Sequence, residues 1–287
     1  MNTKPSPSGL SEDAVTVTRV ADRQWHALDD DLVVGRGYAE RRADGRLFVC
    51  IDAWHDAAFG RLAEAMLAEV PTPLHAVVDE ADAGLTARWQ RAGFTVRRRE
   101  WEYAVPTDPQ VTGLGAVTPP PGVTIVPAGQ ADERLLRAVD RAIRDEVEAT
   151  AGWQSMPAEV IPRPAGDTVV DPSKYAVAAA SDRYLGLIRV VTVNRPRIGL
   201  LAVRAGEQRR GIARALLAHA LETLHRAGHA AAWTEVQETN VAARALLAGV
   251  GARPVGSNLE LEMQLRPKSQ PEPELQPKPE PKPELGR

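Results

Sequence analysis

Cysteine is nearly absent from this sequence: Cys50 is the one cysteine in 287 residues, so no disulfide can form within the chain. Cys50 lies in the apolar stretch LFVCID, where a small buried side chain is a more ordinary role than a nucleophile. The opening residues MNTKPSPSGLSED lack the apolar core of a secretory signal, and no apolar run reaches the roughly 20 residues of a membrane span. We therefore expect a cytoplasmic protein with no membrane partner.

The sequence also lacks a strong charge of either sign, with 35 basic and 38 acidic residues and a net charge of −3. Because proteins that bind nucleic acid present a basic surface, no nucleic-acid partner is expected. The arginine run at 97–99 is followed by Glu100 and Glu102, and we interpret it as the solvated end of a strand. The six histidines show no spacing typical of metal ligands, so we expect no metal.

Proline marks the divisions of the chain. The ending RPKSQPEPELQPKPEPKPELGR has almost nothing to bury, and we expect disorder over 267–287, as over 1–13. The stretch 106–121 is dense in proline and glycine and is interpreted as a linker. Two folded units remain, at 14–105 and 122–266.

The second unit has the pattern of alternating strands and helices. Its strand at 197–203 has no polar alternation, which predicts burial on both faces. The other expected elements are a strand at 122–128, a helix at 132–152, a hairpin over 173–193, a helix at 211–228, a strand at 229–236, a helix at 240–251 and a strand at 258–265.

The first unit resembles a degenerate repeat of the second. A constant offset pairs Asp82 with Asn240, Trp89 with Leu247, and Gly93 with Gly251. Two unrelated strand–helix–strand segments are the alternative.

The loop after the strand at 197–203, with the sequence EQRRGIAR, has the features of an anion site. The first turn of a helix has unpaired N–H groups and the positive end of the helix dipole. Gly211 allows close approach of a ligand or a positive φ, Arg209 and Arg210 suit bidentate contact with phosphate, and Gln208 can donate from its amide. Neither G-x-x-x-x-G-K-[ST] nor G-x-G-x-x-G after a strand is present, so the loop predicts a diphosphate site of another kind.

The stretch QRRGIA, residues 208–213, matches the [QR]-x-x-G-x-[GA] motif of the GNAT family of N-acetyltransferases. Val203 stands where that family's central strand ends, and the strand AAAWTEV and the pattern N-x-x-A-x-x-L from Asn240 to Leu246 follow in family order. The resemblance covers about 122–266. It implies an α/β fold (α+β, mixed sheet) of two GNAT-like units in tandem, each a mixed central sheet flanked by helices, with a degenerate N-terminal half.

The same resemblance implies acetyl-CoA as the acyl-donor cosubstrate, with its pantetheine arm between two splayed strands. Asn240 would face the thiol end of the cofactor, or cap a helix, or do both. The other implied cofactor-binding residues are Leu201, Ala202 and Val203 for the acetyl and pantetheine part, and Gln208, Arg209, Arg210, Gly211, Ile212, Ala213 and Arg214 for the pyrophosphate.

Acetyl transfer needs a neutral amine, a donor for the oxyanion and a proton for the leaving thiolate. Glu235 is the candidate base, with a structural carboxylate as the alternative, and a backbone N–H near Val203 could serve the oxyanion. The position of the family's usual tyrosine is Leu247, which cannot donate a proton. Either another group or water serves as the acid, or the thiolate leaves unaided, or transfer is poor.

The acceptor is expected to be the amine of a small molecule or peptide. Its pocket would be walled by the first helix of the second unit and the residues after it. Acidic residues there could favour a cationic amine above an apolar floor, although a solvated helix face is the alternative; the residues concerned are Asp145, Glu146, Glu148, Trp153 and Met156.

Two functions stay open from the sequence: an N-acetyltransferase that works by direct transfer, and a non-catalytic acyl-CoA-binding sensor or interaction protein. A helix-turn-helix DNA binder is disfavoured by the net charge and the flanking strands. The first unit has only HDA between LFVCIDAW and its helix, so we expect it to keep the topology but to bind no CoA. The chain is expected to be a monomer or a homodimer.

Overall fold

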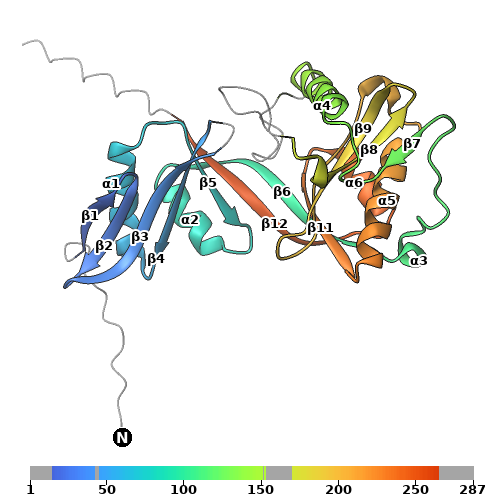
Figure 1. Cartoon of the computed structure of the whole chain (residues 1–287). Coiled ribbons are helices and arrows are strands. Elements are labelled where there is room, and N and C mark those ends of the chain that lie inside the picture. Colours follow the sequence, from blue (N-terminus) through green and yellow to red (C-terminus); the bar gives the residue numbers. More distant parts are fainter. Residues whose placement is uncertain (1–14, 43–44, 151, 153–169, 265–287) are drawn as a thin grey trace, which may run out of the picture.

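The computed structural model describes residues 15–42, 45–150, 152 and 170–264 (Figure 1). The tails expected to be disordered, at 1–13 and 267–287, lie outside the described residues, as do Trp153 and Met156. The strands form one continuous mixed sheet in the order β1-β2-β3-β4-β5-β12-β6-β11-β10-β9-β8-β7. The fold is therefore of the mixed α/β class that the resemblance implied.

The strands are β1 (Thr16–Ala21), β2 (Gln24–Asp29), β3 (Leu32–Arg41), β4 (Leu47–Ala53), β5 (Leu74–Asp79), β6 (Thr95–Pro106), β7 (Thr124–Val126), β8 (Tyr175–Ala180), β9 (Arg183–Val191), β10 (Arg197–Val203), β11 (Ala231–Gln237) and β12 (Arg253–Met263). The helices are α1 (Asp56–Glu69), α2 (Ala83–Arg91), α3 (Pro109–Thr112), α4 (Glu133–Glu148), α5 (Ile212–Arg226) and α6 (Val241–Ala248), with short 3₁₀ turns η4 (Pro172–Lys174) and η5 (Ala205–Glu207).

Helix α1 covers one face of the N-terminal strands because its apolar side chains recur on one side. Phe59, Leu62 and Met66 are buried there among side chains of β2, β3, β4 and β5. Gly35 on β3 allows this close packing, since a Cβ at that position would lie 2.9 Å from Leu62 Cδ1. The N-terminal half thus has a core of its own.

In the C-terminal half, helices cover both faces of the sheet (Figure 1). Side chains of β8 alternate between two cores: Tyr175 and Val177 pack with α4, whereas Ala176 and Ala178 pack with α5 and α6. Strand β10 was expected to be buried on both faces, but only Ile198 is fully buried and its other residues are half-buried. The strand lies where the sheet opens, as described below.

The two halves exchange their last strands. Strand β12, from the end of the chain, lies between β5 and β6, and β6 lies between β12 and β11 (Figure 1). The apolar side chains follow the exchange: Tyr103 and Val105 of β6 belong to the C-terminal core, whereas Leu259 and Leu261 of β12 belong to the N-terminal core. Each half therefore completes the sheet and core of the other.

The internal repeat is confirmed by equivalent local structure. Asp82 caps α2 by accepting from Leu85 N, and Asn240 caps α6 by accepting from Ala243 N. The same offset relates Trp89 to Leu247, both buried, and Gly93 to Gly251, both with positive φ. It also relates the two bulges of the β6–β12 ladder, at Arg97 and Val255. The pairing of Glu100 with Asn258 joins two positions related by this same offset, so the halves are related by a pseudo-twofold axis between them.

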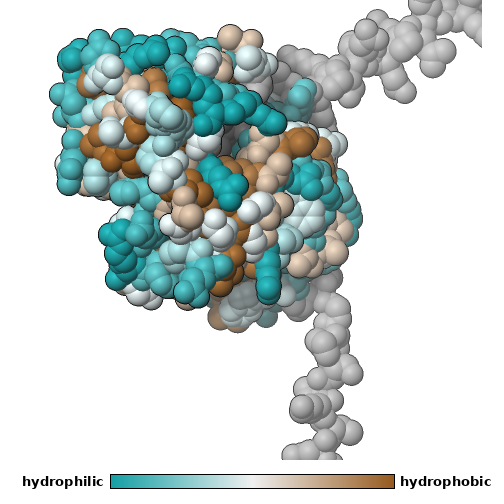
Figure 2. Space-filling view, turned by 90° about the vertical axis from the view of Figure 1, so that its right-hand side faces the viewer, coloured by the Kyte–Doolittle hydropathy of each residue, from teal (hydrophilic) through white to brown (hydrophobic). Residues whose placement is uncertain are grey.

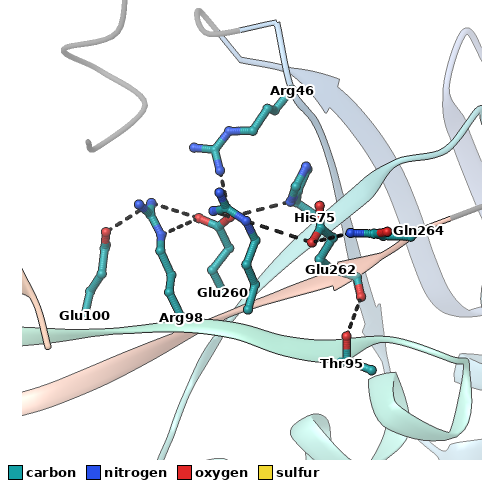
Figure 3. Close-up of polar contacts among 9 residues, drawn as sticks. Arg46, His75, Thr95, Arg98, Glu100, Glu260, Glu262 and Gln264 are labelled. Atoms are coloured by element: carbon teal, nitrogen blue, oxygen red, sulfur yellow. Dashed lines mark hydrogen bonds and ion pairs between the residues drawn. The ribbon is translucent and has the colours of Figure 1, made fainter. Parts of the chain in front are cut away.

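The arginine run at 97–99 is not solvated, as the sequence suggested, but half-buried near the start of β6. Glu260 on β12 is 4% exposed and accepts hydrogen bonds from Arg98 Nε at 2.9 Å, Arg97 Nη1 at 2.6 Å and Arg46 Nη1 at 2.7 Å (Figure 3). On the other face, Arg99 donates to Glu80 and Glu238. The residues that neutralise this run are distant in sequence, which is why its local context was misleading.

The segment that joins the halves is packed against the C-terminal core. Thr107 is fully buried, its Oγ1 donates to His229 O at 2.5 Å and its N–H donates to Ala230 O. Asp108 caps α3, and Leu114 and Val123 are buried. The stretch interpreted as a linker is therefore partly buried against the C-terminal half.

Candidate active site

The sheet opens between β10 and β11. These parallel strands pair at Arg197 and Trp233, and the described residues show no further pair between them. Just past this point β10 carries a bulge at Gly199, where its register with β9 shifts between Ile198 and Leu200. Below the opening the two strands are still tied by Thr234, whose Oγ1 donates to Ile198 O at 2.9 Å. The structure therefore contains the splayed pair that the resemblance implied.

The half-buried residues Leu201, Ala202 and Val203 lie on β10 past the bulge, on the open side of the sheet. They pair with β9 on one edge, which leaves the other edge of β10 facing the opening. Among the described residues, the strand partner of that edge ends at Arg197. An extended ligand could therefore hydrogen-bond to this edge as an added strand would.

The loop at 204–211 brings the chain from β10 to the first turn of α5. Arg204 N donates to Leu185 O, and Gln208 Nε2 donates to Val203 O at 3.2 Å, so the loop folds back on the strand it leaves. Arg209 has φ 62° and Gly211 has φ 88°, both left-handed. Gly211 is the N-cap residue of α5 and makes no side-chain cap, so the first-turn N–H groups are open to an anion.

Arginines surround this helix end. Arg209, Arg210 and Arg214 are exposed, and Ile212 and Ala213 form the start of α5 between them. Glu207 moderates the charge, because it pairs with Arg210 and with Arg183 Nη2, the latter at 2.9 Å. Figure 2 shows the face at the right of Figure 1, where hydrophilic residues surround groups of apolar ones. The predicted pyrophosphate residues thus lie together at one helix N-terminus.

Glu235 lies on β11 beside the opening. Its Oε2 accepts from Arg197 Nη2 at 2.8 Å, and its side chain is 26% exposed. The neighbouring strand is β6 of the N-terminal half, where Glu102 pairs in register with Glu235. Burial raises the pKa of Glu100, one position along the same face, and the charges of Glu235 and Glu260 add to the rise while Arg98 opposes it. The N-terminal half therefore forms one wall beside the candidate base, which the sequence did not indicate.

The two positions expected on α6 have clear local roles. Asn240 Oδ1 accepts from Ala243 N at 3.0 Å, so the helix-cap role is present. Leu247 is 6% exposed and packs in the C-terminal core. An apolar, buried side chain therefore occupies the place of the family's usual tyrosine.

Glu146 does not serve as an unengaged acidic residue of an acceptor pocket. Its Oε1 accepts from Arg204 Nε at 2.6 Å, and its Oε2 accepts from Ala205 N at 2.7 Å. The carboxylate is thus committed to the start of the loop at 204–211. The neighbouring Asp145 is exposed on α4.

The N-terminal half has the same opening but a different helix end. Strands β4 and β5 pair only at Leu47–Leu74 and Phe48–His75 along the described residues. His55 caps α1, since its Nδ1 accepts from Ala58 N at 3.2 Å. The next residue, Asp56, pairs with Arg88 and Arg91. A side chain and a carboxylate therefore occupy the place that is open in the C-terminal half.

Neither a metal-binding cluster nor a membrane-spanning helix is found among the described residues. Along the described residues, His, Cys, Asp and Glu do not gather in any group of three or more that could hold a metal ion. Within the same residues, every helix is too short or too polar to cross a membrane.

The comparisons with known proteins agree with this geometry. The model of the acetyltransferase (GNAT) family matches residues 141–252. A search of curated protein sequences gives no significant match. A GCN5-related N-acetyltransferase from Sphaerobacter thermophilus is 17% identical, with a TM-score of 0.57 over 87% of this chain and 83% of that one. A GCN5-related N-acetyltransferase from Kribbella flavida is 16% identical, with a TM-score of 0.52 over 87% and 90%.

A tandem GNAT protein from the clavulanic acid biosynthesis pathway is 16% identical, with a TM-score of 0.60 over 88% of this chain and 83% of that one. At such identities the solved structures show the fold, and the family model adds the assignment of the C-terminal segment. Residues 141–252 therefore belong to a GNAT-family domain, and the chain joins it to a second, N-terminal half with a GNAT-like fold.

Proposed function

We propose that this protein is an acetyl-CoA-dependent N-acetyltransferase whose active site lies in the C-terminal half. One observation carries the proposal: the opening between β10 and β11 leads directly to an α5 N-terminus that no side chain caps. An extended chain and a diphosphate need these two features side by side.

The residues present fit acetyl-CoA. A Cβ at Gly211 would meet no atom within 4 Å, so the space in front of the helix end is open. Arg209 and Arg214 are exposed beside it and can contact phosphate oxygens. The free edge of β10 at 201–203 can hold the amides of the pantetheine arm. When bound there, the cosubstrate supplies an activated acetyl group as a thioester.

The chain's own groups must handle two protons. Attack by an amine forms a C–N bond and breaks the C–S bond, so the amine loses a proton and the thiolate gains one. Glu235, beside the opening, is the proposed base, directly or through water. Backbone N–H groups on the free edge of β10 can donate to the oxyanion. Because Leu247 is apolar and buried, water is the proposed proton source for the thiolate.

The alternative is a non-catalytic protein that binds acyl-CoA. The observation that favours it is Leu247, together with the pairing of Glu235 with Arg197, which commits the candidate base to an ion pair. This alternative keeps the binding site and removes only the transfer step.

Titration of acetyl-CoA into the purified full chain tests the proposal, followed by measurement of CoA release with a panel of small and peptide amines. Binding with amine-dependent release supports the acetyltransferase. Binding without release on any amine supports the alternative. Absence of binding would contradict both.

A further inference from the structure

Glu146 connects two parts of the C-terminal half that are distant in sequence. It lies in the last turn of α4, and each of its carboxylate oxygens accepts one hydrogen bond from the start of the loop at 204–211. One donor is the Arg204 guanidinium at 2.6 Å and the other is the backbone N–H of Ala205 at 2.7 Å. The contact therefore fixes both a side chain and the main chain.

Helix α4, which carries Glu146, is packed firmly against the sheet. Leu136, Val139 and Ile143 are buried against β8 and β9. Asp140 and Arg144, also buried, form an ion pair at 2.6 Å between positions six and two residues before Glu146. Because the helix is anchored along one buried face, a hydrogen bond from its last turn restricts the partner more than a contact with a mobile side chain would.

The loop's other contacts are with β10, which it leaves, and with β9, where Gln208 Nε2 donates to Val203 O and Glu207 pairs with Arg183. Arg204 N donates to Leu185 O, and the next N–H, that of Ala205, donates to Glu146. From there the chain makes the single 3₁₀ turn η5 and passes Arg209, in its left-handed conformation, before it reaches Gly211. A change in the direction of the Ala205 peptide would therefore be carried to the N-terminus of α5.

We infer that Glu146 is a positioning residue, which holds the loop at 204–211 in the conformation that receives the diphosphate of acetyl-CoA. The inference rests on the proposed function and adds to it a role for α4 on the cosubstrate side. Glu146 touches neither substrate nor cosubstrate in this role. It acts through Arg204 and Ala205.

The sign of the effect separates this role from simple electrostatics. A carboxylate near a diphosphate repels it, so removal of the Glu146 charge would strengthen binding if only long-range charge mattered. Glutamine keeps only one acceptor oxygen, so Glu146→Gln would lose one of the two hydrogen bonds and weaken binding if the loop must be held. The same variant therefore gives opposite results under the two accounts.

The test compares Glu146→Gln with Asp145→Asn in the full chain. Both variants remove one negative charge, and Asp145 is the exposed neighbour on the same helix. For Glu146→Gln we expect the Kd of acetyl-CoA to rise on the order of tenfold, since one hydrogen bond to a charged group is lost. Asp145→Asn should leave it unchanged. Acetyl-pantetheine, which lacks the diphosphate, should bind Glu146→Gln and the wild-type protein equally.

A measurement without ligand keeps the inference testable on its own. In the ligand-free chain, the amide hydrogens of 205–211 should exchange faster in Glu146→Gln than in Asp145→Asn, and thermal unfolding should show that both variants fold. Glu146→Ala, which removes both acceptors, should have at least as large an effect.

The possible failures are distinct. No binding of acetyl-CoA to the wild-type chain would overturn the proposed function and, with it, this role of Glu146. Binding to the wild type that is equal or tighter in Glu146→Gln would overturn the inference alone. Weaker binding of acetyl-pantetheine by Glu146→Gln would also overturn it, because the effect would then not pass through the diphosphate loop.

Discussion

Arg46 and Arg195 occupy equivalent positions in the two halves, and each pairs with a glutamate on the strand supplied by the other half. Arg46, just before β4, pairs with Glu260 on β12, and Arg195, just before β10, pairs with Glu102 on β6. The register of β4 with β5 and of β10 with β11 makes the two arginines equivalent, and Glu102 and Glu260 are related by the offset of the repeat. The exchange of strands is thus secured in the same way on both sides.

A chain cut between its halves should therefore stay in one piece. A protease site inserted at Gly115–Ala116, two exposed residues of the connection, allows the folded full chain to be cleaved. We expect the two fragments to coelute in gel filtration under native conditions and to separate in denaturant, because each contributes a strand to the core of the other. Separate elution in native buffer would contradict this.

Replacement of Glu260 should destabilise the protein. Glu260→Gln leaves Arg46, Arg97 and Arg98 without their shared carboxylate at a buried position, which should lower the free energy of unfolding by ~3 kcal/mol. Glu262→Gln is the matched control, since that side chain is more exposed and lies 3.9 Å from Arg97 Nε. Denaturant unfolding of both variants measures the difference, and an equal loss in the two would show that the network adds nothing.

The same residue should make stability depend on pH in the acid range. Burial opposes ionisation of Glu260, but the nearby His75 and the charges of Arg98, Arg46 and Arg97 outweigh it and lower its pKa from 4.5 to about 2. Its contribution is therefore complete above pH 4.5 and is lost as the pH falls towards 2. As the pH is lowered from 4.5 to 2, the free energy of unfolding should decrease less for Glu260→Gln than for the wild type. If the free energy of unfolding depended on pH equally in both proteins, Glu260 would not be the source of the dependence.

Replacement of Gly211 should remove acetyl-CoA binding without unfolding the chain. A side chain in Gly211→Val would enter the open space before α5 and would cost about 1–2 kcal/mol at a positive φ. Gly228→Val is the control at the other end of α5, with φ 85° and equally open surroundings. We expect both variants to lose similar stability in thermal unfolding, and only Gly211→Val to lose affinity in calorimetry. Retained affinity in a folded Gly211→Val would disprove the diphosphate site.

Glu235 should matter for transfer and not for binding. If it removes the amine proton, Glu235→Gln should lower kcat on the order of a hundredfold or more, and the Kd of acetyl-CoA should stay the same. Glu222→Gln on α5 is the control for loss of one charge, since that exposed side chain pairs only with its helix neighbour Arg226 in the described structure. Unchanged kcat would leave Glu235 as a structural partner of Arg197.

Acetyl-CoA should bind with a stoichiometry of one per chain. His55 and Asp56 occupy the α1 N-terminus, and Val77 stands in the N-terminal half where Glu235 stands in the C-terminal half. Calorimetry should therefore give one site, which Gly211→Val abolishes completely. A second site that survives in Gly211→Val would show that the N-terminal half also binds the cosubstrate.

Local features of the sequence predicted much of the C-terminal half. The loop around Gly211, the cap at Asn240 and the repeat that relates it to Asp82 depend on residues close together in the chain, and the structure places them as expected. Strand β12 was expected to begin at Asn258, but it begins at Arg253, because its first residues pair with β6.

Pairings between distant segments could not be predicted in this way. Strands β6 and β12 each have the pattern of an ordinary last strand, and nothing in that pattern states which sheet they join. Arg98 and Glu260 are 162 residues apart, so the burial of an arginine run was not visible locally. Glu146 was assigned to the acceptor side for the same reason, since its partners Arg204 and Ala205 lie on another element.

The exchange of strands sets different constraints on different parts of the N-terminal half during evolution. If acetyl-CoA binds only in the C-terminal half, the α1 N-terminus at His55 needs no opening, and its sequence could change without loss of binding. The last strand of the N-terminal half could not, because Val105 and Tyr103 are part of the core that holds α5 and β10, the two elements that the loop at 204–211 connects. A half without an open helix N-terminus is thus retained as an inseparable piece of its neighbour.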